Sequence, residues 1–561
     1  MIGMDVTPQQ PSEPPHSDHS DPDHLDRPPP ASSPSEPCDD VPPETPPTRP
    51  TPDCEPPFGL DPESSADPPP ASLHTTLRRA AFGMVAAAVL VTGAVVAVPD
   101  DGKKAAPPSV PGGVSRALAA TNSGSPASLS DLKAMIGDRQ SWVGTHPSDA
   151  RSWAVLGTAY VEWGQRSADA AYYGRAEQAL RRSLDAQPGD RGNTAALVGL
   201  AALANARHDF VTAKKWGETV RTRQPKDWTV YPVLIDAYDG LGEYTAAGKA
   251  AEKFTALRSG VPALSRTAQM YRNQGRREDA LTTAQNAANR ATAPAEKAGC
   301  LHRLGELAWE RGESEKAVAQ YSAALRADPA HHPSLAGRAR ALAALGRTDE
   351  AQRDYRAALS RLPRPEYMLE LGELYESLGL ENDSLSQYTR LRKSLARADG
   401  FGVDAALLLG RFEADHGNAA AAVRLLKTEW QRRHHSATVA DALGWALHRS
   451  GDSASALQYA QKAADTGGGT ALYAYHLGVI ERDLREYGPA RRHLEEALRT
   501  NAQFSPLAAP AARKALDALS RPSATGPRDM RPTPGPDRMA AGPGRSTHAP
   551  AGAASPAPGV H

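Results

Sequence analysis

Apolar side chains recur three or four residues apart through most of the chain from residue 129 onward, which is the period of an amphipathic helix. No sustained alternation of apolar and polar residues, which would indicate half-buried strands, interrupts this pattern. Glycine and proline divide it at short intervals. We therefore predict an all-α fold for residues 129–520, built from many short helices.

The helical pattern contains a returning phrase: Leu-Gly, a large residue, a Gly turn, an Ala, an aromatic residue, another Ala and a Pro. One copy runs through Gly305, Gly312, Tyr321 and Pro329. The next copy ends at Pro363, about 34 residues beyond the previous proline. Further copies precede and follow these two, and those between residues 188 and 294 are degenerate. Copies that agree at several positions predict a repeat architecture.

In these positions the chain resembles the tetratricopeptide-repeat family over residues 129–520. The resemblance implies a solenoid, or superhelix, of about ten units with a cap at each end. Each unit is a helix A, a tight turn and a helix B. Small residues let the paired helices approach, Gly permits a left-handed turn after helix A, and Pro ends helix B. Since no unit can bury its apolar face alone, the units are expected to stabilise one another by stacking.

The same resemblance implies a concave groove, lined by the A helices, that binds an extended or helical segment of a partner protein. An alternative interpretation is that these positions are ordinary solvated helix faces, with the tryptophans packed between units. The family's contact positions fall here on Glu306, Trp309, Glu310, Arg340, Glu373, Glu376, Arg411, Asp415, Trp445, His448, Arg449, Tyr475, Arg482 and Asp483.

Composition separates the two tails from the repeats. Residues 1–77 contain 22 of the 49 prolines and 15 acidic residues against two arginines, so a disordered acidic tail is predicted there. Residues 521–561, rich in Pro, Gly and Ala, are predicted to be a second disordered tail. The remaining net positive charge is too dilute for a nucleic-acid surface. The expected partners are therefore other proteins or peptide segments, and not nucleic acid.

Residues 82–98 form a run of 17 residues without a charge, and Arg78 and Arg79 precede it while Asp100 and Asp101 follow. This pattern predicts one transmembrane signal-anchor segment at 78–99, with the first tail cytoplasmic and the repeats extracytoplasmic, joined by a flexible linker at 100–128. Cleavage after Ala97 would instead give a secreted repeat protein. A third possibility is a cytoplasmic repeat regulator.

Candidate chemistry is sparse. The three cysteines, Cys38, Cys54 and Cys300, form neither a disulfide framework nor a CxxC metal pair. No set of residues typical of a hydrolase, a kinase or a zinc protease is present. We therefore expect no enzymatic activity, no cofactor, no metal and no small-molecule substrate. The predicted function is that of an adaptor, or scaffold, for protein–protein interaction.

Overall fold

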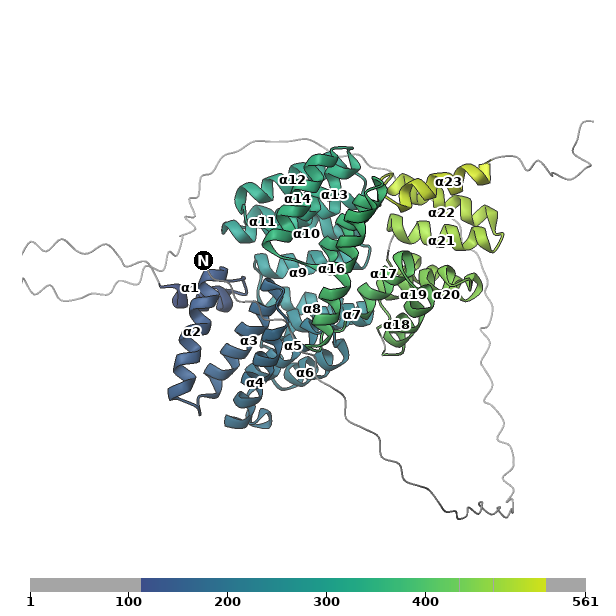
Figure 1. Ribbon diagram of the computed structural model, residues 1–561. Helices are drawn as coiled ribbons and strands as arrows, with labels where there is room; N and C mark the ends of the chain where they lie inside the picture. The colour runs from purple at the N-terminus through teal and green to yellow at the C-terminus, as the bar shows by residue number, and fades with distance from the viewer. Residues whose placement is uncertain (1–111, 433, 468, 521–561) are drawn as a thin grey trace, which may run out of the picture. The chain divides into compact units, whose positions relative to one another are not determined.

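The computed structural model describes residues 112–432, 434–467 and 469–520. Within these ranges the chain forms 23 α-helices and one 3-10 turn, with no strand (Figure 1). The predicted all-α repeat solenoid is confirmed in this coarser form.

Consecutive helices pack on each other as hairpins, and each hairpin stacks on the next. The pairs are α1 (Gly113–Ser123) with α2 (Leu129–Thr145), α3 (Ala150–Ser167) with α4 (Ala171–Ala186), α5 (Thr194–Ala206) with α6 (Phe210–Arg223), α7 (Val230–Leu241) with α8 (Tyr244–Leu257), α9 (Val261–Asn273) with α10 (Arg277–Arg290), α11 (Pro294–Glu310) with α12 (Ser314–Ala327), α13 (His332–Ala344) with α14 (Thr348–Arg361), α15 (Pro365–Ser377) with α16 (Glu381–Asp399), α17 (Ala406–His416) with α18 (Ala419–Gln431), α19 (Ala437–Arg449) with α20 (Ser453–Thr466) and α21 (Ala471–Asp483) with α22 (Tyr487–Thr500). The 3-10 turn η1 (Gly189–Arg191) follows α4, and α23 (Ala508–Ser520) packs on α22.

The number of units differs from the ten predicted, because α1 and α2 form an additional hairpin before α3. Helix α1 lies within residues 100–128, where the sequence indicated a linker. Its residues are mostly small or polar, and Ala117 is its one fully buried side chain. Such a helix is stabilised by packing on its neighbour more than by its own pattern.

Glycines end several A helices in the left-handed conformation, as predicted. Positive φ angles between 70° and 75° occur at Gly242, Gly275, Gly312, Gly346 and Gly379. Only glycine adopts this region without steric cost, which explains why a Gly turn recurs in many of the repeats.

Small residues allow the hairpins to interlock. The Tyr321 ring of α12 is fully buried between α11 and α13. A Cβ atom would lie 2.5 Å from this ring at Gly305 and 2.6 Å from it at Gly337. The Gly of the Leu-Gly pair therefore makes room for the large B-helix residue of the repeat phrase, and one ring joins two successive units.

The solenoid returns onto itself. We call α5–α12 the first course and α16–α23 the second course (Figure 1). Four successive loops of the second course meet four successive A–B turns of the first course. At the first of these contacts, the Asp404 N–H donates to the Arg207 carbonyl at 2.9 Å, and His208 Nδ1 lies 2.7 Å from the Asp404 carbonyl. Residues nearly two hundred positions apart are thereby held together.

The next contacts follow in the same order along both courses. The Ala437 N–H donates to Tyr244 Oη at 2.9 Å, Arg277 Nη2 donates to the Gly469 carbonyl at 2.5 Å, and Asn501 Nδ2 donates to the Trp309 carbonyl at 2.8 Å. We refer to these four together as the docking contacts. They use polar atoms at helix ends, where backbone groups have no partner inside the helix.

The predicted localisation, a single-pass membrane protein, is contradicted by the structure. Among the residues described, no helix is both long and apolar enough to cross a bilayer. The longest helix, α16, has 19 residues but is strongly charged. The predicted segment 82–98 lies outside the described residues, as do the two tails. The membrane assignment is therefore withdrawn.

Candidate functional site

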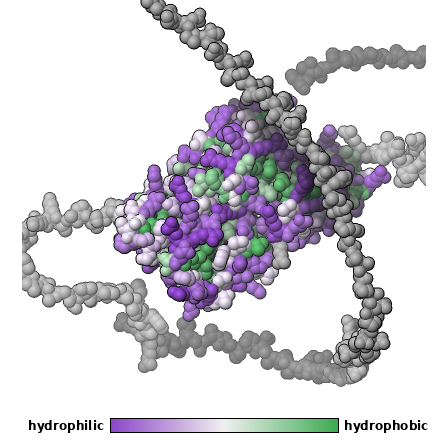
Figure 2. Space-filling view, turned by 60° about the horizontal axis from the view of Figure 1, so that its bottom comes forward, coloured by the Kyte–Doolittle hydropathy of each residue, from purple (hydrophilic) through white to green (hydrophobic). Residues whose placement is uncertain are grey.

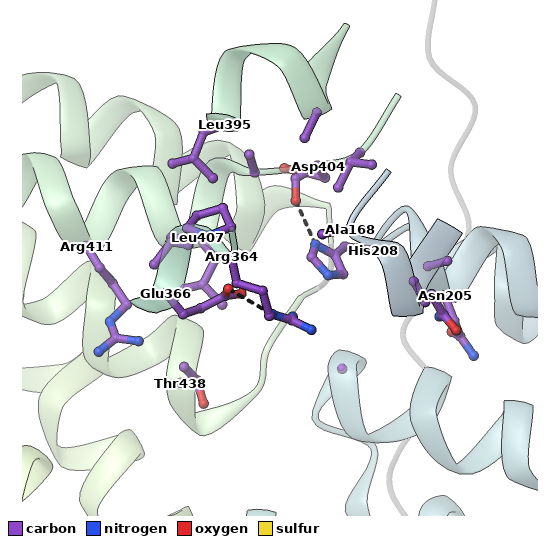
Figure 3. A pocket seen from close by; sticks show the side chains of 18 of the residues that line it. Ala168, Asn205, His208, Arg364, Glu366, Leu395, Asp404, Leu407, Arg411 and Thr438 are labelled. Carbon is purple, nitrogen blue, oxygen red and sulfur yellow. Dashed lines mark hydrogen bonds and ion pairs between the residues drawn. The ribbon is translucent and has the colours of Figure 1, made fainter. Parts of the chain in front are cut away.

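A cavity of about 1300 Å³ lies between the two courses, lined by residues from α3 to α11 and from α15 to α21. Figure 3 shows Asn205 on one side of it and Leu395, Leu407, Arg411 and Thr438 on another. On the outer face shown in Figure 2, apolar residues form separate small patches among hydrophilic ones. A cavity of this size is large enough to hold a ligand.

The first-course wall carries equivalent residues from three successive A helices: Asn205 of α5, Asp239 of α7 and Asn273 of α9. Asn273 Nδ2 donates to Asp239 Oδ2, and Asn205 Nδ2 donates to the Val233 carbonyl at 2.9 Å. Asn205 Oδ1 and Asp239 Oδ1 are both buried without a hydrogen-bond partner in the described residues. Both residues line the cavity, so a rotation of either side chain would let a ligand with N–H groups supply the missing donors.

The electrostatics of this wall are unusual at Asp239. Burial raises the pKa of its carboxyl to about 6, and the nearby negative charge of Asp236 adds to this rise, whereas the Asn273 amide opposes it. Asp236 itself pairs with Arg266 at 2.6 Å. The charge on the wall therefore changes near neutral pH at one position, Asp239.

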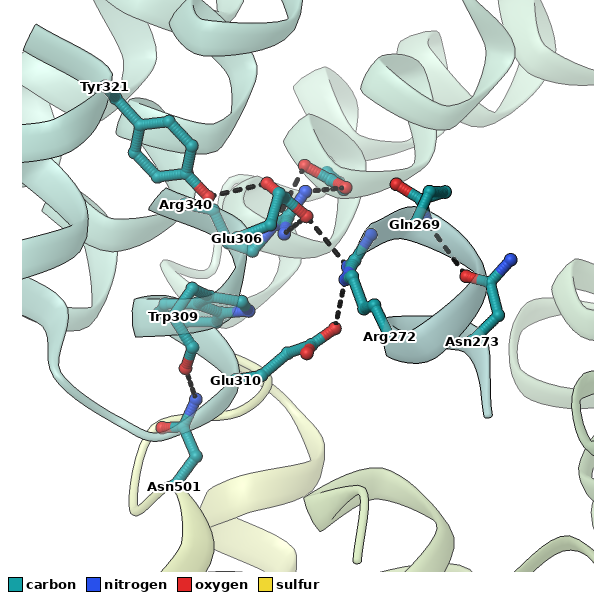
Figure 4. Close-up of polar contacts among 10 residues, drawn as sticks. Gln269, Arg272, Asn273, Glu306, Trp309, Glu310, Tyr321, Arg340 and Asn501 are labelled. Atoms are coloured by element: carbon teal, nitrogen blue, oxygen red, sulfur yellow. Dashed lines mark hydrogen bonds and ion pairs between the residues drawn. The ribbon is translucent and has the colours of Figure 1, made fainter. Parts of the chain in front are cut away.

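Beside this wall, a ladder of alternating charges, in which Glu306 is buried and the other members are about a quarter exposed, joins four A helices (Figure 4). Glu306 lies 3.0 Å from Arg272 and 3.4 Å from Arg340, and Arg340 lies 2.9 Å from Glu370. Tyr321 Oη donates to Glu306 at 2.5 Å. Burial alone would raise the pKa of Glu306, but Arg340 and Arg272 hold it well below its usual range. The ladder therefore joins successive repeats and presents no free charge.

The structure distributes the fourteen expected contact residues over three groups. The first group lies at or beside the cavity, and Glu310 and Arg411 are its only members that line it. Glu306 and Arg340 belong to the ladder, and Trp309 is buried beside them with its carbonyl in a docking contact.

The second group contains Glu373 and Glu376, whose carboxylates lie 3.5 Å and 3.2 Å from the His416 ring. These contacts raise the pKa of His416, although burial opposes the rise. The group joins α15 to α17 and lies outside the residues that line the cavity.

The third group is brought together on α17, α19 and α21. Trp445 is buried, stacks on His476 at 4.1 Å and donates from Nε1 to Asp415 Oδ1 at 2.7 Å. Tyr475 is buried against the same indole. The remaining members surround this core, namely His448, Arg449, Arg482 and Asp483.

The second-course wall contains cations that sequence reasoning missed. Arg390, Lys393 and Arg397 all lie on α16 and all line the cavity. The family's contact positions lie on A helices, whereas α16 is a B helix. The available signal was the length of α16, which has 19 residues where α12 and α14 have 14.

Comparisons with known proteins agree with this architecture. Residues 298–331 match the model of a tetratricopeptide repeat, and residues 113–195 match that of a bacterial transcriptional activator domain. No curated protein matches the sequence.

Solved structures resemble parts of the chain. A thermophilic TPR protein of Thermus thermophilus is 22% identical, with 33% of this chain and 99% of that chain covered and a TM-score of 0.29. PilF of Pseudomonas aeruginosa is 17% identical, with coverages of 36% and 90% and a TM-score of 0.30. The APC/C hetero-tetramer Cut9–Hcn1 is 13% identical, with coverages of 73% and 84% and a TM-score of 0.36.

The stacked hairpins, the internal copies and the matched repeat together support the tetratricopeptide-repeat family as the class of this protein. A fold of this class indicates a scaffold for protein–protein interaction.

Proposed function

We propose that this protein is a scaffold that holds a segment of a partner protein in the cavity between its two courses. The observation that carries the proposal is the pair of buried, unpartnered acceptors Asn205 Oδ1 and Asp239 Oδ1 on one wall, opposite free cations on the other. A polypeptide supplies N–H donors along its backbone and acceptors on its side chains, so it can satisfy both walls.

Of the contact residues expected from the family, Glu310 and Arg411 are proposed to face the bound segment, because both line the cavity. The cluster around Trp445 is proposed to act differently, as a rigid support for α17 and α19. Its indole is already covered by His476 and held by Asp415, so little of it is available to a partner.

Site-specific photo-cross-linking in the source cell tests the proposal. A cross-linking amino acid at Ser394, which lines the cavity, is compared with one at Lys253, an exposed residue of α8 outside it. We expect one or a few proteins to be cross-linked from position 394 and not from position 253. Equal labelling from both positions, or no protein labelled from position 394, would overturn the proposal.

A second candidate function is regulation of transcription through a protein partner. It is favoured by the match of residues 113–195 to a bacterial transcriptional activator domain. A cross-linker at the exposed Ser141 of α2 distinguishes it. Cross-links to RNA polymerase or to a DNA-bound regulator would support this function, and partners unconnected with transcription would count against it.

A further inference from the structure

The cavity-facing cations of α16 form a regular strip. Arg390, Lys393 and Arg397 follow the i, i+3, i+7 spacing that places side chains on one face of a helix. With a rise of about 1.5 Å per residue, the strip is roughly 10 Å long. Arg411 of α17 lines the same cavity and adds a fourth cation.

These cations lack the partners that neighbouring arginines have. In the described part of the chain, no carboxylate lies within ion-pair distance of the four, and Arg390 donates only to the amide oxygen of Gln387, at 2.9 Å. By contrast, Arg392 of the same helix does not line the cavity and pairs with Glu413 at 2.8 Å. The face turned toward the cavity is thus the face left without counter-charges.

Like charges gathered along a cavity wall repel one another and attract an anionic ligand. The opposite wall limits which anion fits. Asn205 Oδ1 and Asp239 Oδ1 lack N–H donors, and the nearby carboxylates of Asp236 and Glu310 already have arginine partners in Arg266 and Arg272, so this wall offers no free cation to an anion. A single-stranded nucleic acid carries a phosphate at every residue and would place some of them against these carboxylates.

An extended polypeptide fits better, because successive side chains point to opposite faces. Its carboxylates can face α16 while neutral side chains and backbone N–H groups face the acceptors of α5 and α7. A helical segment would not serve, since its N–H groups are already bonded internally.

We infer that the cavity selects an extended partner segment with acidic residues at alternate positions, which bind the α16 strip and Arg411. This inference rests on the proposed function and names the chemistry of the partner segment.

The test uses the full-length protein and four fluorescent probes of twelve units. Three are Thr- and Ser-rich peptides that carry Glu, Gln or Lys at alternate positions, and the fourth is single-stranded RNA. Fluorescence polarisation at low and moderate salt gives the affinities. We expect the Glu peptide to bind best, and more weakly as salt rises.

The key variant is Arg390→Gln/Lys393→Gln/Arg397→Gln. Each exposed contact is worth up to about fivefold, so affinity for the Glu peptide should fall roughly 30-fold. The matched control is Arg353→Gln/Arg424→Gln/Lys427→Gln, which removes the same charge from residues outside the cavity and should leave the affinity within about twofold. The double reversal Lys393→Glu/Arg397→Glu should gain binding of the Lys peptide, a result that misfolding cannot produce.

Equal losses in the triple variant and its control would overturn the inference, because they would indicate attraction to net charge alone. Preference for the Gln or Lys peptide or for RNA, or no binding of the Glu peptide, would overturn it as well. In those cases cross-linking from position 394 still decides whether the cavity holds a partner protein, so the proposed function and the inference can fail separately.

Discussion

The docking contacts make a sharp prediction at Gly242, which ends α7. Its φ of +75° is nearly the same as that of Gly346, at +74°, and of Gly379, at +72°. Substitution by alanine forces a side chain into the left-handed region at all three positions, at a shared cost of about 1–2 kcal/mol. Gly346 and Gly379 have no atom within 4 Å of a new Cβ. At Gly242, by contrast, that atom would lie 2.5 Å from the His435 carbonyl oxygen.

The excess cost at Gly242 can be worked from the contacts that must move. The His435 N–H donates to the Leu241 carbonyl at 3.3 Å, and the Ala437 N–H donates to Tyr244 Oη at 2.9 Å. Each hydrogen bond contributes about 1 kcal/mol. Gly242→Ala should therefore destabilise docking by about 2 kcal/mol more than Gly346→Ala does, which is a factor of roughly 25.

Hydrogen exchange measures this difference locally, which matters because repeat arrays need not unfold in one step. We expect the amides of residues 435 and 437 to exchange about ten to thirty times faster in Gly242→Ala, and to be unchanged in Gly346→Ala and Gly379→Ala. Gly312→Ala, whose Cβ would lie 3.0 Å from the Asn501 Cα, should affect the last docking contact in the same way but less strongly. Equal exchange at 435 and 437 in Gly242→Ala and Gly346→Ala would refute the return of the second course onto the first.

Three further predictions concern single side chains. Glu306→Gln removes the buried carboxylate shared by the part-buried Arg272 and Arg340 and should lower the free energy of unfolding by about 3 kcal/mol, against less than about 1 kcal/mol for the more exposed Glu310→Gln. Chemical denaturation compares the two variants, and equal losses would contradict the ladder. Because its folded-state pKa of about 6 exceeds the ordinary 3.8, Asp239 destabilises the fold as pH rises from about 4 to 6, so Asp239→Asn should raise the free energy of unfolding by about 3 kcal/mol at pH 7 and leave it unchanged near pH 3.5. Thermal unfolding at both pH values checks this, and a loss at pH 7 would contradict it. Trp445→Phe loses the hydrogen bond to Asp415 and part of the stack on His476, so it should lower the local stability of α19 by about 1–2 kcal/mol. Amide exchange in α19 should then be faster, and unchanged exchange would show that the Trp445 cluster is not a support.

The helices and turns could be predicted because their signals are local. A small residue at the Gly305 position and a large one at the Tyr321 position recur in many copies, so the repeat phrase itself reports their packing. The left-handed glycines, such as Gly346, follow from backbone sterics alone. Helix α1 was missed because its residues are mostly small or polar, with a single side chain buried against its neighbours.

The site was less predictable for a different reason. The contacts to the carbonyls of Arg207, Leu241 and Trp309 use a group that every residue has, so residue type does not mark these positions of the first course. Only their combination creates the cavity and decides which helix faces line it. Two of the expected contact residues, Glu310 and Arg411, lie there, whereas the α16 cations are placed by the return of the chain.

The two walls of the cavity belong to different courses, which couples ligand binding to docking. A segment that contacts both Asn205 and the α16 strip binds the docked form and cannot bind the undocked form equally well. Such a ligand stabilises docking by RT ln(1 + [L]/Kd), or about 2.7 kcal/mol at a hundredfold excess over Kd. The amides of residues 435 and 437 should then exchange up to roughly a hundredfold more slowly in the complex than in the free protein. If the undocked form predominates in Gly242→Ala, that variant should bind the ligand about 25-fold more weakly. A ligand that binds tightly but leaves these amides unchanged would contact only one wall, which would contradict a site built from both courses.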